Sequence, residues 1–306
     1  MFRLAAVATW GLACAEGAGG ADPASESLPE PEMLVELDGW STQLRQDSDY
    51  VWWMRGGQLE RVPKAGGAVE VVASGNTYTI ADDSIYVEEW SSDFVTKYSL
   101  HGDVQGQVAL VGGGSPLYCD ALEARGPALY CANGRGVFRS IELSSDWLAL
   151  GTSGEYQATG LAVSSSRVYW TTGSLQSVPV GGGATDAIGP ANNSGMDMLG
   201  DSVFFGSNSG GLAGVYEYSE SGGLGLVSRS SQPVRDVAVI ESGFYELDVA
   251  GALRWHAFGS AAPRLLVEGN ADPAVEDVAA DATHVYYVDF SPGSSARSRI
   301  LRRAHL

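Results

Sequence analysis

Basic residues, histidines and cysteines are all scarce in this chain of 306 residues. It has 18 Lys and Arg against 37 Asp and Glu, which gives a formal net charge of -19 at pH 7, and only 4 His and 3 Cys. Because this charge would repel a phosphate backbone, we expect no nucleic-acid partner. No metal-spaced pair of histidines and no serine nucleophile elbow occurs, so the sequence offers little for catalysis, and we expect no cofactor.

Helical periodicity and long hydrophobic runs are also missing. No stretch places apolar residues at positions i, i+3, i+4 and i+7, as a long amphipathic helix requires. Instead, the 40 Gly help to build clusters of Gly, Ser, Asn and Asp, and these clusters separate short runs rich in Val, Tyr and Trp. Such runs are typical of many short strands joined by tight turns, so the sequence predicts an all-β fold.

One short apolar and aromatic segment recurs seven times. The copies are "VWWMR", "IYVEE", "LYCAN", "VYWTT", "VFFGS", "FYELD" and "VYYVD", and they begin at Val51, Ile85, Leu129, Val168, Val203, Phe244 and Val285. Each copy lies between an apolar segment before it and an alternating segment after it, and a further short apolar segment ends the unit. A period of about 40 residues with four strands per unit is typical of propeller blades. A two-sheet sandwich, the alternative, has no reason for a sevenfold repeat.

The seventh unit ends at the C-terminus without its fourth strand. A matching segment, "MLVELDGW", begins at Met33, before the first complete unit. We therefore predict a seven-bladed β-propeller of four-stranded antiparallel blades over residues 33–306, in which Met33 to Leu37 complete the last blade. This closure protects sheet edges that would otherwise be open.

The N-terminus has the outline of an export signal. Arg3 precedes an apolar stretch from Leu4 to Leu12, which is too short to span a bilayer, and Ala13-Cys14 follow. The end of this segment resembles the lipobox of bacterial lipoproteins, in which a Cys is lipidated after cleavage; here Gly11 stands where Leu is usual. We expect a signal segment over residues 1–14 with Cys14 as the lipid anchor. Residues 15–32, rich in Pro, Gly and acids, form a flexible tether.

Two cysteines remain if Cys14 is lipidated. Cys119 and Cys131 lie in "LYCDALEARGPALYC", which we interpret as two antiparallel strands joined by a turn centred near Arg125. This symmetric placement would put the two cysteines opposite each other, where a disulfide is possible. Two free, buried thiols are the equally open alternative.

The Val168-Tyr169-Trp170-Thr171 segment resembles the Tyr-Trp-Thr-Asp repeats of extracellular propellers. The segment from Arg61 to Gly67 is similar to the Arg-Val-Pro-x-x-Gly-Gly ending of repeats in secreted bacterial propeller proteins. The Asp of the motif is present in two copies, as Asp248 and Asp289. The resemblance implies an extracellular role in binding other proteins.

A candidate binding site lies on loops of one rim. The connections between blades 7, 1 and 2 carry two aromatic and three acidic residues, namely Trp40, Glu88, Glu89, Trp90 and Asp93. Aromatic rings beside carboxylates suit a sugar or a cationic side chain. The structural alternative is that both tryptophans only pack the loops. The acidic residues of the other turns, such as Asp47, Asp82 and Asp281, are interpreted as backbone caps rather than calcium ligands.

The sequence thus favours an exported, lipid-anchored binding scaffold at the bacterial cell envelope. We expect a monomer in the outer membrane that faces the periplasm or the cell surface, touches the membrane only through its lipid, and binds a protein or a glycan. The alternative from another class is a carbohydrate-active enzyme, a glycosidase or lyase, which would use two rim carboxyl groups such as those of Glu88 and Asp93.

Overall fold

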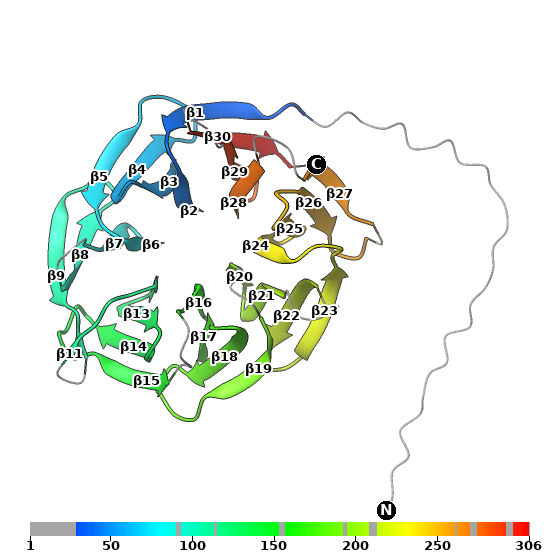
Figure 1. Cartoon of the computed structure of the whole chain (residues 1–306). Helices are drawn as coiled ribbons and strands as arrows, with labels where there is room; N and C mark the ends of the chain where they lie inside the picture. Colours follow the sequence, from blue (N-terminus) through cyan, green and yellow to red (C-terminus); the bar gives the residue numbers. More distant parts are fainter. Residues whose placement is uncertain are drawn as a thin grey trace, which may run out of the picture.

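All regular elements of the described part of the chain are β-strands, and seven four-stranded sheets stand in a ring (Figure 1). The computed structural model describes residues 29–89, 93–112, 115–152, 157–191, 195–207, 213–260, 262–269, 274–291 and 296–305. The predicted signal segment, Cys14 and most of the predicted tether lie outside these residues. No described helix could span a membrane.

Each of these seven sheets is one blade, and in blades 1 to 6 the strands run from the centre of the ring outward in chain order. Blades 1 to 3 comprise β2 (Ser41–Gln46), β3 (Tyr50–Arg55), β4 (Gln58–Pro63) and β5 (Glu70–Ser74); β6 (Thr77–Ala81), β7 (Ser84–Glu88), β8 (Phe94–Ser99) and β9 (Val104–Ala109); and β12 (Ala121–Arg125), β13 (Ala128–Asn133), β14 (Gly136–Ile141) and β15 (Leu148–Thr152).

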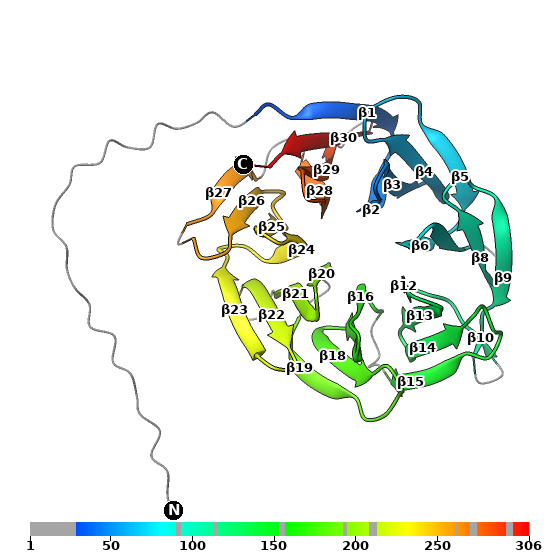
Figure 2. The same cartoon turned by 180° about the vertical axis from the view of Figure 1, so that it is seen from behind.

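Blades 4 to 6 repeat this order on the other side of the ring, as the view from behind also shows (Figure 2). They comprise β16 (Gly160–Val163), β17 (Arg167–Thr171), β18 (Ser174–Pro179) and β19 (Asp186–Pro190); β20 (Met196–Leu199), β21 (Ser202–Ser207), β22 (Gly214–Ser219) and β23 (Gly223–Arg229); and β24 (Val234–Ile240), β25 (Gly243–Asp248), β26 (Leu253–Ala257) and β27 (Arg264–Val267).

Blade 7 combines both ends of the described chain. Its inner strands are β28 (Ala274–Ala280), β29 (His284–Ser291) and β30 (Arg297–Ala304), and its outer strand is β1 (Glu32–Asp38). In the antiparallel β1–β30 pair, Val35 lies opposite Ile300. The predicted seven blades and the predicted closure by an N-terminal strand are both confirmed, with β1 one residue longer at each end than expected.

The third residue of the second strand is aromatic in every blade. These residues are Trp52, Tyr86, Tyr130, Tyr169, Phe204, Tyr245 and Tyr286, and all are at most 9% exposed. The buried side chains form seven clusters, and each cluster draws on two adjacent blades. A propeller therefore has no single core, because each blade buries its faces against its two neighbours.

Glycines set the hairpins between the third and fourth strands. Gly66 and Gly182 have φ values of 81° and 84°, which L side chains rarely adopt, and Gly223 has 72°. These glycines belong to Gly-Gly pairs in the turns of blades 1, 4 and 5, and the positive φ explains the residue type.

The region around the two cysteines differs from the prediction in register. Arg125 pairs with Ala128, so the turn lies at Gly126 and Pro127 rather than at Arg125. Cys131 therefore lies opposite Leu122, and Cys119 precedes β12. A disulfide joins the two cysteines and ties the connection from blade 2 to the second strand of blade 3. This connection also contains an unexpected hairpin of β10 (Val111–Gly112) and β11 (Ser115–Pro116).

Candidate functional site: the central channel

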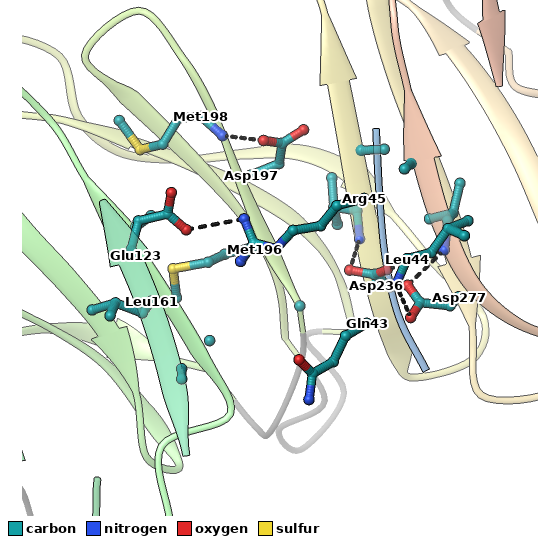
Figure 3. A pocket seen from close by; sticks show the side chains of 18 of the residues that line it. Gln43, Leu44, Arg45, Glu123, Leu161, Met196, Asp197, Met198, Asp236 and Asp277 are labelled. Atoms are coloured by element: carbon teal, nitrogen blue, oxygen red, sulfur yellow. Dashed lines mark hydrogen bonds and ion pairs between the residues drawn. The ribbon is translucent and has the colours of Figure 1, made fainter. Parts of the chain in front are cut away.

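The inner strands of the seven blades surround a channel with a cavity of about 670 Å³ (Figure 3). The lining includes three arginines, Arg45, Arg125 and Arg235, and six acidic residues, Asp120, Glu123, Asp197, Asp236, Glu276 and Asp277. The lining is therefore polar and has an excess of acidic side chains.

Each arginine of the channel already has a partner. Arg45 of blade 1 donates to Oε2 of Glu123 in blade 3 at 3.1 Å, and Thr79 of blade 2 donates to the other oxygen of the same carboxylate at 3.2 Å. Arg235 forms an ion pair with Glu276. Arg125 donates to the backbone carbonyl of Val163 at 2.6 Å.

The four remaining acidic residues share one arrangement. Each accepts a hydrogen bond from a backbone N–H of the next blade around the ring. The pairs are Asp120 with Ala158 at 3.2 Å, Asp197 with Val239 at 2.8 Å, Asp236 with Val278 at 3.3 Å, and Asp277 with Leu44 at 2.9 Å. An inner strand has an edge with no strand beside it, so these carboxylates satisfy donors that a sheet would otherwise leave unpaired.

Depth inside the ring shifts the pKa values of these groups. Burial raises the pKa of Asp197, although the N–H groups of Val239 and Met198 oppose the shift. Burial and the neighbouring Asp277 raise the pKa of Asp236 well above its ordinary value. Burial also raises the pKa of Asp277, and its hydrogen bond with Asp236 acts in the opposite direction. For Arg45, burial lowers the pKa, but Glu123 together with Tyr78 and Asp197 outweighs this effect and the pKa is raised.

The structure describes four of the five rim residues named from the sequence, and these four differ in exposure. Trp40 lies between β1 and β2 and is 59% exposed, and Asp93 is exposed. Glu88 is only 3% exposed, and its Oε1 accepts the backbone N–H of Cys119 at 2.9 Å, so it joins blade 2 to blade 3. Glu89 accepts hydrogen bonds from Thr96 and Tyr98 of its own blade. Trp90 lies outside the described residues.

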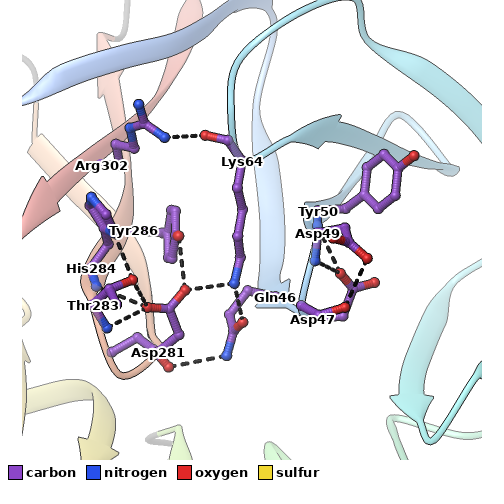
Figure 4. A network of polar contacts seen from close by, with 12 residues as sticks. Gln46, Asp47, Asp49, Tyr50, Lys64, Asp281, Thr283, His284, Tyr286 and Arg302 are labelled. Atoms are coloured by element: carbon purple, nitrogen blue, oxygen red, sulfur yellow. Dashed lines mark hydrogen bonds and ion pairs between the residues drawn. The ribbon is translucent and has the colours of Figure 1, made fainter.

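Asp47 and Asp281 cap backbone turns, as expected (Figure 4). Asp47 accepts the backbone N–H groups of Asp49 and Tyr50, and Asp281 accepts those of Thr283 and His284. Asp281 also belongs to a network between blades 7 and 1. Its Oδ2 lies 2.6 Å from Nζ of Lys64 and accepts a hydrogen bond from the hydroxyl of Tyr286 at 2.9 Å. Within the described residues, no group of three or more His, Cys, Asp or Glu could hold a metal ion.

Sequence reasoning missed the channel acids. Asp197, Asp236 and Asp277 each stand immediately before an apolar residue in a first-strand segment, in "MDML", "RDVA" and "EDVA". One acidic residue recurring in an apolar strand of a repeat was a usable signal. It points to a side chain directed at the channel or at the next blade, because a strand buried on both faces is otherwise continuously apolar.

No family model and no curated protein matches the chain. Solved structures match over most of its length. The crystal structure of BamB from Moraxella catarrhalis is 12% identical with a TM-score of 0.53, and the match covers 89% of this chain and 98% of that one. PorZ, an essential bacterial surface component of the type-IX secretion system of Porphyromonas gingivalis, is 15% identical with a TM-score of 0.59 over 90% of this chain and 39% of that one.

YCF48, in a structure bound to D1 peptide, is similar to this chain as well. It is 14% identical with a TM-score of 0.64, over 90% of this chain and 95% of that one. At these identities the likeness shows a shared propeller fold.

Proposed function

We propose that the chain is an exported, lipid-anchored propeller that binds a protein partner at the bacterial cell envelope. The observation that carries the binding role is the channel, where four carboxyl groups take part in no ion pair with a described residue. A closed ring of rigid blades around such a cavity suits recognition of a segment that enters from one rim. PorZ is a surface component and YCF48 has been seen with a peptide, and both precedents support this role for the fold.

The proposed location at the cell envelope rests on the N-terminal sequence. Cys14 with residues 15–32 behind it is the arrangement that a surface-anchored domain needs. The described chain begins at the outer edge of blade 7, at β1, so a tether would leave the ring without crossing the channel (Figure 1).

Lipidation is tested in the producing bacterium with globomycin, which blocks the peptidase that cleaves lipoprotein signals. We expect the wild-type chain to accumulate as a slower band on a gel, and Cys14→Ser, the matched control, to be unaffected by the drug. An unshifted wild-type band would contradict Cys14 as the anchor.

Partner binding is tested by photo-crosslinking in the same cells. A crosslinking amino acid at Trp40, an exposed rim residue, is compared with one at Leu265, which is 45% exposed on the outer strand β27. We expect a discrete crosslinked band from the rim position only. Equal bands from both positions, or none from the rim, would argue against recognition at the channel entrance.

The enzyme alternative is not supported by the site. It needs two opposed rim carboxyl groups, and the Glu88 carboxyl group is buried against the backbone of Cys119. We therefore do not propose glycoside cleavage.

A further inference from the structure

Seven residues of the inner strands occupy the same register around the channel. Each pairs with the aromatic third residue of the second strand of its own blade. They are Arg45, Thr79, Glu123, Ala162, Asp197, Ala238 and Ala279. This level of the channel is asymmetric, because blades 1 to 3 supply long or polar side chains and blades 4, 6 and 7 supply alanine.

Blade 5 supplies the acidic group of this level that has a small residue on each side, Ala162 of blade 4 and Ala238 of blade 6. Asp197 lies between Met196 and Met198 on β20, and both methionines line the same cavity (Figure 3). The alanines of blades 4 and 6, which flank blade 5, have short side chains, and methionine side chains adapt to an alkyl chain. The lining beside Asp197 is thus short or apolar, whereas Arg45 is held in its pairing with Glu123.

The charge at this level is unbalanced. Glu123 is matched by Arg45, but Asp197 forms no ion pair with any described residue. Its Oδ2 accepts the N–H of Val239 and its Oδ1 that of Met198, each at 2.8 Å. A carboxylate oxygen has two acceptor positions, so each oxygen of Asp197 retains one.

We infer that this part of the channel binds a primary ammonium group on an alkyl stem, such as a lysine side chain presented by the protein partner. The stem would lie along Met196 and Met198 and the ammonium would reach Asp197. The inference rests on the proposed binding function and names the chemistry that the channel recognises.

The same contacts disfavour both an anion and a guanidinium group as the ligand. An anion would have to displace Glu123 from Arg45 while facing Asp197, Asp236 and Asp277. A guanidinium prefers a carboxylate with two free, coplanar acceptors, and both oxygens of Asp197 already hold a backbone donor. A compact ammonium with rotatable donors needs only the acceptor positions that remain.

The test uses the exported part of the chain with ¹³C-labelled methionine methyl groups. The two channel signals are assigned from Met196→Leu and Met198→Leu. Three probes of equal chain length are titrated, namely hexylamine, hexanol and hexanoate. We expect hexylamine alone to shift both signals with a saturable curve. An equal response to hexanol or hexanoate, or no saturable shift with hexylamine, would overturn the proposal.

Two variants locate the charge. Asp197→Asn should weaken hexylamine binding at least tenfold, and Asp82→Asn, which changes an exposed turn residue, should leave it unchanged. Arg45→Met should tighten binding severalfold, because it releases Glu123. This gain cannot result from loss of folding, so it keeps the test decisive if Asp197→Asn misfolds; weaker or unchanged binding in Arg45→Met would contradict the inference.

A rim crosslink without hexylamine binding would reject the ammonium site and leave the proposed function standing.

Discussion

The Oδ2 atom of Asp277 accepts a hydrogen bond from the backbone N–H of Leu44 at 2.9 Å, although 233 residues separate the two. This bond joins the inner strand of blade 7 to that of blade 1. On the outer side, β1 and β30 pair within blade 7. The ring is therefore closed at two radii, once by a strand pair and once by a carboxylate.

The β1–β30 pair predicts that substitutions at two of its residues differ sharply in their effect on the free energy of unfolding. Ile300 is fully buried and packs in one cluster with Leu34 and Leu37. Met33, which belongs to the same β1–β30 pair, is 52% exposed. Ile300→Ala should lower the free energy of unfolding by about 2–5 kcal/mol, because it opens a cavity in a packed cluster. Met33→Ala should change it by less than about 0.5 kcal/mol. Urea unfolding measures both, and equal losses would show that β1 does not complete blade 7.

The raised pKa of Asp236 predicts a pH dependence of stability. Its folded-state pKa lies above the ordinary 3.8 because of burial and of Asp277. The folded chain therefore binds this proton more tightly than the unfolded chain, and the resulting stability is present at low pH and lost as pH rises through the raised pKa. Asp236→Asn mimics the protonated group at every pH. We expect the variant to need more urea to unfold than the wild type at pH 7.5, and the two to converge as pH falls toward 3.8, the ordinary pKa of the group.

Asp82→Asn is the control for this prediction, because Asp82 is exposed on a turn. Its stability profile should run parallel to that of the wild type. Parallel profiles for Asp236→Asn as well would show that the Asp236 carboxyl group titrates normally in the folded chain.

The repeat was predictable because it is local. Each second strand contains an apolar residue followed by an aromatic one, as in Val168-Tyr169, and such a strand is buried on both faces in every blade. The partners of single carboxylates were not predictable in this way. Glu88 is the last residue of β7, where a rim residue was expected, yet its carboxyl group accepts the backbone N–H of Cys119, 31 residues away. That contact depends on the packing of two blades, which the period alone does not specify.

The disulfide predicts a loss of stability on removal of both sulfur atoms. Cys119 and Cys131 are 12 residues apart in the chain, and closing a loop of this size is worth about 2–4 kcal/mol through the unfolded state. The double variant Cys119→Ala with Cys131→Ala should unfold at a correspondingly lower urea concentration. A thiol assay on the unfolded protein should detect both thiols only after reduction. Two reactive thiols without reductant would instead support the alternative of free cysteines.

The ion pair between Lys64 and Asp281 links blade 1 to blade 7, and both side chains are 17% exposed. Lys64→Met should lower the free energy of unfolding at pH 7 by about 1–2 kcal/mol, less than the 3–5 kcal/mol of a fully buried pair because solvent screens part of it. Burial alone would raise the pKa of Asp281, but Lys64 and the Thr283 and His284 donors lower it below 3.8. Stability from this carboxylate is therefore present above pH 3.8 and lost as pH falls below it.

The difference between the wild type and Lys64→Met should consequently shrink when urea unfolding is repeated at pH 3. Lys97→Met is the matched control, because Lys97 forms no ion pair with a described residue and lies 5.6 Å from the ring centre of Tyr86. It should cost less than Lys64→Met at pH 7, and its cost should not depend on pH between 7 and 3. If the cost of Lys64→Met were also independent of pH in this range, the lysine would act through its alkyl chain, and the charge of Asp281 would have no part in closing the ring.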